Sequence, residues 1–132
     1  MTERLERELR RLREGGQDVE LLAGARSFVL YRSVPTAGAA RDLPVVTDVV
    51  VPVPEGYPAA MIDLAGLPTG SPLLSVLRGG TNSQGVVEVG GRQWQLASYH
   101  PHNGGGGPPW DPTRHGFDTY FDHLVSWLAR LN

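Results

Sequence analysis

Residues 45–53, VVTDVVVPV, are the stretch that decides the fold class of this chain. Valine and threonine are β-branched and favour extended backbone, so the stretch predicts the strongest strand in the sequence. Pro52 and Pro54 offer no backbone N–H to a neighbouring strand. We therefore expect this strand to end at a sheet edge or to leave the sheet at these prolines.

Further strands are predicted on both sides of this stretch. Residues 18–23 and 27–34 are largely apolar segments separated by a glycine-containing turn, and the second alternates between two faces. Residues 84–89 and 92–98 flank a Gly-Gly pair, which is typical of a tight hairpin. Together these segments predict an antiparallel sheet of about four strands.

Two segments lack any regular pattern. Residues 66–83 are rich in Gly, Pro, Ser and Thr and predict a loop with a short helical turn at 72–77. Residues 99–112 contain four consecutive glycines, Gly104–Gly107, which are costly to order and suit a segment that moves. Two interpretations of this second segment stay open: a surface that orders on contact with a partner, and a plain surface linker.

Helices are predicted near both ends of the chain. Residues 2–14, with Thr2 as N-cap, carry leucines at i, i+4 and i+7, a thin apolar stripe typical of a helix at one edge of a domain. Residues 117–131 keep an apolar pattern at helical spacing throughout. The apolar positions of this second helix are Phe117, Tyr120, Phe121, Leu124, Val125, Leu128 and Leu131. The predicted fold is a single α+β domain over residues 1–132, with a helix, an antiparallel sheet, a long loop and a C-terminal helix.

Composition narrows the classes of function. The 132 residues are 40% hydrophobic, which suits one globular domain. A formal net charge of −2 gives no reason to expect nucleic acid as a partner. No apolar run approaches the ~20 residues that span a bilayer, and the charged start does not resemble a signal peptide. We expect a cytoplasmic chain with neither nucleic-acid nor membrane partners.

Cysteine and lysine are both missing from the chain. Without cysteine there are no disulfides, thiolate metal sites or thiol nucleophiles. Without lysine there is no Schiff-base amine and no side-chain amine to accept an isopeptide bond.

The histidines and one serine are the residues best suited to chemistry. His100, His102 and His115, with Asp111, could supply metal ligands, but no helical HExxH spacing fixes them. Ser98 lies two residues before His100, yet no GxSxG elbow presents it as a nucleophile. We therefore predict no catalytic residue, no metal and no cofactor, with a histidine-based enzyme kept as an alternative.

Trp110 lies beside prolines shortly before the C-terminal helix. Such a ring is expected to pack against that helix while its indole N–H finds an acceptor. We therefore predict a structural role for Trp110.

Five stretches, taken in order, give the chain a resemblance to the ubiquitin-conjugating-enzyme (UBC) superfamily. Residues 4–12, RLERELRRL, resemble the charged first helix of that family, and 54–58, PEGYP, resemble its P-x-x-YP turn. Residues 100–102, HPH, stand where the family has His-Pro-Asn, followed by W-x-P at 110–112 and a helix at 117–131. The chain is most similar to a divergent bacterial branch of this superfamily, whose members are often encoded beside ubiquitin-like proteins and their activating enzymes.

The resemblance also shows where the chain departs from the family. UBC enzymes carry acyl groups as a cysteine thioester, and this chain has no cysteine. The motif asparagine is His102 here, with Asn103 one place late, and the hairpin at 84–98 is an insertion. The resemblance therefore implies a catalytically inactive pseudoenzyme that acts as a binding or scaffold module in a bacterial ubiquitin-like modification system.

Partners implied by the resemblance are a ubiquitin-like protein or an activating-enzyme-like protein. The alternative function is that of a noncatalytic accessory protein in a defence or secretion system unrelated to ubiquitin-like conjugation. The candidate partner-binding residues are Arg4, Arg7, Arg11, Tyr57, Tyr99, His100, His102 and Asn103.

Overall fold

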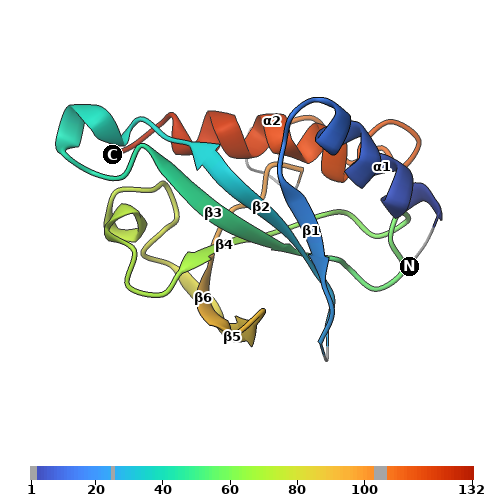
Figure 1. Ribbon diagram of the computed structural model, residues 1–132, viewed down its shortest axis with the longest axis horizontal. Coiled ribbons are helices and arrows are strands. Elements are labelled where there is room, and N and C mark those ends of the chain that lie inside the picture. Colours follow the sequence, from blue (N-terminus) through green and yellow to red (C-terminus); the bar gives the residue numbers. More distant parts are fainter. Residues whose placement is uncertain (1–2, 25, 103–106) are drawn as a thin grey trace.

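The computed structural model describes residues 3–24, 26–102 and 107–132, and in them a six-stranded antiparallel sheet lies beneath two helices (Figure 1). Thr2 and Asn103, both named in the sequence predictions, lie outside the described residues. The strand order is β1-β2-β3-β4-β6-β5. The elements are α1 Glu3–Glu14, β1 Val19–Leu22, β2 Phe28–Pro35, η1 Gly38–Arg41, β3 Val46–Pro52, β4 Ala65–Pro68, η2 Pro72–Ser75, β5 Ser83–Val89, β6 Arg92–Ala97 and α2 Phe117–Leu128.

The α+β class and both helices are confirmed, whereas the expected count of about four strands is wrong. Five of the six strands match segments predicted as strands, and the sixth, β4, lies mostly in a stretch predicted as loop. Its glycine and proline disfavour strand by propensity, but pairing with β6 and close packing outweigh that preference. A Cβ on Gly66 would lie 3.0 Å from Leu96 and 3.1 Å from Val50, so glycine lets β4 approach its neighbours.

Strand β3 ends at Pro52, and Pro54 follows it, so the strand leaves the sheet at these prolines, the second of the two expected outcomes, and does not lie at a sheet edge. Pro52 pairs with Phe28 of β2, and the register between β3 and β4 includes one pair, Val50 with Gly66. The chain therefore leaves the sheet after β3 and returns as β4.

Each side of the sheet has its own apolar cluster. Val29 and Tyr31 of β2 belong to the larger cluster beneath the helices, while Phe28 and Leu30 face the smaller one, built around Trp94. Both helices lie along the same side of the sheet (Figure 1). In the described parts of the chain, neither helix is long and apolar enough to cross a membrane.

Candidate functional site

Ser98, His100 and Asp63 form a continuous hydrogen-bonded chain where β6 ends. The Ser98 hydroxyl lies 3.0 Å from Nε2 of His100, and Nδ1 of His100 lies 2.7 Å from Oδ1 of Asp63. The side chains of His100 and Asp63 are each 33% exposed. A nucleophile, a base and an orienting carboxylate in this order are the arrangement on which serine acyl-transfer chemistry depends.

The backbone on both sides of this chain is held in place. Leu64, next to Asp63, has φ 64°, which is rare for a residue with a branched side chain. It is held there because its N–H donates to the carbonyl of Tyr99 at 2.9 Å and its carbonyl accepts from the hydroxyl of Tyr120 at 3.1 Å. These two hydrogen bonds anchor the backbone immediately after Asp63.

The backbone of Gly79 contacts the backbone of Ser98. The N–H of Ser98 donates to the carbonyl of Gly79 at 3.2 Å, and Gly79 has φ 75°. A Cβ at Gly79 would lie 2.1 Å from the carbonyl oxygen of Ser98, so glycine is required for this approach.

A second group of imidazoles lies two residues further along. The ring centroid of His102 is 4.7 Å from that of His115, 4.9 Å from that of His123 and 5.1 Å from that of Trp110. Nδ1 of His102 lies 2.8 Å from the carbonyl of Pro108, which can only accept, so Nδ1 carries the proton. Nε2 of His102 is buried and has no hydrogen-bond partner among the described residues.

Burial and neighbouring imidazoles lower the pKa values of His115 and His123. The pKa of His123 is lowered first by burial and then by the nearby His102 and His115. The pKa of His115 is lowered by burial and then by His102. Within residues 3–24, 26–102 and 107–132, no group of three His, Asp or Glu side chains is placed to hold a metal ion.

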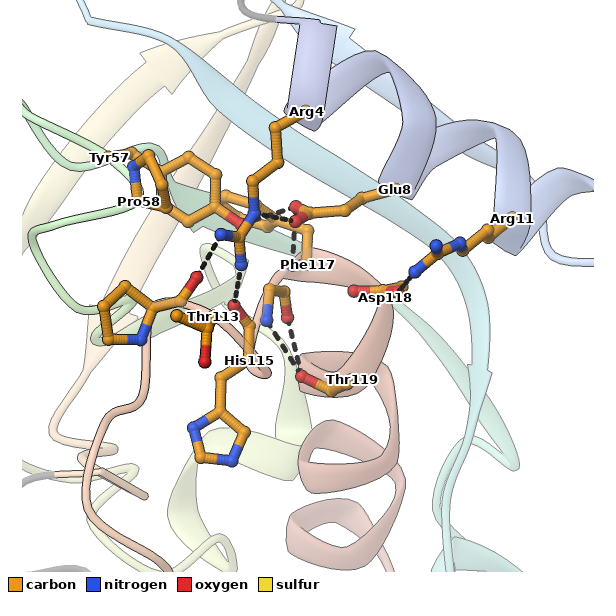
Figure 2. Close-up of polar contacts among 12 residues, drawn as sticks. Arg4, Glu8, Arg11, Tyr57, Pro58, Thr113, His115, Phe117, Asp118 and Thr119 are labelled. Atoms are coloured by element: carbon orange, nitrogen blue, oxygen red, sulfur yellow. Dashed lines mark hydrogen bonds and ion pairs between the residues drawn. The ribbon is translucent and has the colours of Figure 1, made fainter.

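The best-buried polar group centres on Glu8 (Figure 2), which is 3% exposed. Its carboxylate accepts from the Arg4 guanidinium at 2.8 Å, from the Phe117 backbone N–H at 3.1 Å and from the Tyr57 hydroxyl. The Phe117 N–H is the first of α2, so Glu8 satisfies a donor at the positive end of that helix. The pKa of Tyr57 is raised well above its usual range, first by burial and then by the bond to Glu8.

Arg4 ties the same network to the segment before α2. Its guanidinium also donates to the carbonyls of Pro112 and His115. Beside it, Arg11 forms an exposed ion pair with Asp118 at 3.1 Å (Figure 2). Arg4, Arg11 and Tyr57 thus all have intramolecular partners.

The other candidates from the sequence are scattered. Arg7 is exposed on α1. Tyr99 donates its hydroxyl to the carbonyl of His123 at 2.8 Å and stacks on Trp127 at 4.5 Å, so it packs against the core. Trp110 is half-buried, and its indole N–H donates to the carbonyl of Pro58 at 3.0 Å.

Asp63, Glu8 and His123 are site residues that sequence reasoning did not name. Asp63 sits in a short apolar run, Met61 to Leu64, with no motif around it. Glu8 has the spacing of an ordinary helical charge, four residues from Arg4. The one available signal was the Ser98-x-His100 pair, which lacked its third member in the sequence.

Comparison with known proteins gives no assignment. No protein-family model matches the chain, and no curated protein or solved structure matches it either.

Proposed function

We propose that this chain is a UBC-like binding module of a bacterial ubiquitin-like modification system, working without a thioester. The proposal joins the order of motifs in the sequence to the way these motifs lie together in space. It makes the chain a recognition partner of an activating-enzyme-like protein or of a ubiquitin-like protein.

The observation that carries the proposal is the convergence of three short motifs. The turn at 54–58, the HPH stretch at 100–102 and the W-x-P stretch at 110–112 are far apart in sequence. Trp110 donates to the carbonyl of Pro58, and its ring lies 6.3 Å from that of Tyr57 and 5.1 Å from that of His102. The contacts between the three motifs support the proposal, because together they form one continuous part of the molecule.

A groove next to this convergence supplies a surface for a partner. It has a volume of about 400 Å³ and lies between α1 and the turn at 54–58. Leu5, Val53, Pro54 and Tyr57 give it an apolar floor. The resemblance implies that α1 and this turn contact other proteins, and a groove that joins the two supports that expectation.

Arg7 is the residue best placed to test the proposal, because it is exposed on α1. Binding of the chain to the purified activating enzyme and ubiquitin-like protein of its host should be measured by surface plasmon resonance. We expect Arg7→Glu to weaken binding about tenfold, since charge complementarity at an interface rim governs association.

Arg41→Glu is the matched control. Arg41 is exposed in η1, at the far end of the molecule from α1 (Figure 1), and its reversal changes net charge equally. Binding that responds equally to both reversals would show nonspecific attraction. Absence of any binding to either protein would contradict the proposal and favour an accessory role outside ubiquitin-like modification.

A further inference from the structure

We propose that Ser98 is a nucleophile activated by His100 and oriented through Asp63, and that this site accepts the acyl group of an activated ester. The inference concerns chemistry at a hydroxyl and does not rest on the partner proposed above. The α1 groove and the end of β6 are different places, so each proposal can fail alone.

The direction of the hydrogen bonds suits proton removal from Ser98. A carboxylate oxygen can only accept, so Nδ1 of His100 donates to Asp63 across 2.7 Å. In the neutral ring, Nε2 then holds a lone pair, and it faces the Ser98 hydroxyl at 3.0 Å. This is the tautomer that a general base needs.

The local backbone is arranged to hold this geometry. Leu64, the residue after Asp63, is held in a left-handed conformation, and the backbone of Ser98 lies against Gly79. The left-handed conformation of Leu64 is an observation separate from the hydrogen bonds between the three side chains. Such conformations concentrate at sites where side-chain positions matter for function.

The site is reachable from solvent. His100 and Asp63 are each 33% exposed, and Ser98 is half-buried. All three residues therefore have part of their surface in contact with solvent. Because Asp63 is also partly solvated, its charge is screened, and we expect slower chemistry than in a fully buried triad.

The reaction is an ordinary acyl transfer. Oγ of Ser98 bonds to the acyl carbon while the bond from that carbon to the ester oxygen breaks. Nε2 of His100 takes the hydroxyl proton and passes it to the leaving alcohol. A water molecule, deprotonated by the same nitrogen, then attacks the acyl-serine and releases the carboxylic acid, which restores the Ser98 hydroxyl.

Labelling with a fluorophosphonate, followed by peptide mass mapping, tests the nucleophile directly. We expect a single adduct on Ser98 and hydrolysis of p-nitrophenyl acetate that Ser98→Ala abolishes. Ser75→Ala is the control, because Ser75 is exposed but its hydroxyl bonds to the carbonyl of Pro72 rather than to an imidazole. We expect His100→Gln and Asp63→Asn to lower the labelling rate by about ten- to hundredfold.

A smaller probe removes any dependence on the fit of the reagent. Since the chain has no cysteine, Ser98→Cys and Ser75→Cys each create one thiol. If His100 acts as a base, iodoacetamide should alkylate the Ser98→Cys variant about tenfold faster than the Ser75→Cys variant at neutral pH. The thiolate is the reactive form, and His100 would take the proton of the thiol at position 98. Equal alkylation rates, or labelling of Ser98 that is insensitive to His100→Gln, would overturn the proposal.

Discussion

Two carboxylates, Glu8 and Asp63, each accept hydrogen bonds within a network of side chains, and the two networks differ in burial and in what they leave exposed. The Glu8 side chain is 4% exposed, whereas that of Asp63 is 33% exposed. Glu8 accepts from three structural donors, on Arg4, Tyr57 and the first turn of α2. Asp63 accepts from an imidazole whose other nitrogen faces the Ser98 hydroxyl.

The difference lies in what each chain of bonds leaves available. A buried, fully paired carboxylate fixes the position of two helices. Loss of any one partner leaves a buried charge that water cannot solvate. A partly solvated carboxylate holds less stabilising energy but leaves a base and a hydroxyl within reach of a reagent. Burial therefore separates a network that maintains the fold from one suited to chemistry.

Glu8→Gln should have the largest effect of the changes considered, because it breaks the buried side of this comparison. The amide keeps the shape but loses the charge, so Arg4 and the N-terminus of α2 lose their anionic partner. We expect the free energy of unfolding to fall by about 3 kcal/mol. Urea denaturation measures it, with exposed Glu6→Gln on the same helix as control. A loss under about 1 kcal/mol would refute the role given to Glu8.

Trp110→Ala should have the next largest effect, since Trp110 packs beside Tyr57 at the edge of the Glu8 network. The ring is half-buried and its N–H donates to Pro58. We expect a loss of roughly 2–3 kcal/mol, below the cost of a fully buried tryptophan. Trp110→Phe keeps most of the packing and should lose about 1 kcal/mol, the value of the hydrogen bond. Equal losses for the two variants would place the whole contribution in the hydrogen bond.

The histidine group lies beside both networks, and its titration sharpens the comparison. His115 and His123 have pKa values lowered from 6.5, mainly by burial and then by His102. Below about pH 6.5 the unfolded chain therefore binds more protons, so stability is full above that pH and falls as pH drops toward the folded pKa values.

His102→Phe tests the cause of these lowered pKa values. It keeps a ring in place but removes the imidazole that lowers both pKa values, so the pKa values of His115 and His123 should both rise. Proton NMR titration of the imidazole resonances measures them. Unchanged values would show that burial alone accounts for the shift.

Arg11→Ala should have the smallest effect and tests whether burial, rather than charge, makes the Glu8 network important. Arg11 pairs with Asp118 next to that network, but its side chain is 62% exposed. We expect the free energy of unfolding to change by less than about 0.5 kcal/mol, as for other exposed ion pairs. A loss close to that of Glu8→Gln would show that charge alone sets the contribution.

The sequence predicts the elements of this fold better than its sites, for identifiable reasons. The apolar period of residues 117–131 and the valines of 45–53 are local signals, and α2 and β3 follow them. Strand β4 has no such local signal. The strand forms because it pairs with β6 and because the small Gly66 allows a close approach to its neighbours. Local pattern was enough where a segment supplies its own structure.

Asp63 and Glu8 could not be predicted, because distant parts of the chain define their roles. Asp63 reaches His100, 37 residues later in the chain, because the fold brings the segment before β4 beside the end of β6. Glu8 is buried because the start of α2 docks onto α1. Neither tertiary contact can be recognised from the residues that neighbour the carboxylate in the sequence.

Unfolding of the Asp63→Asn chain in urea tests most directly whether the second network is suited to chemistry rather than to holding the fold. The change keeps the size of the side chain and removes its charge. We predict a free energy of unfolding within about 1 kcal/mol of the unchanged protein, since the His100–Asp63 pair is one-third exposed. A loss of about 3 kcal/mol, as expected for Glu8→Gln, would show that Asp63 holds the fold as Glu8 does, and would contradict the distinction between the two networks.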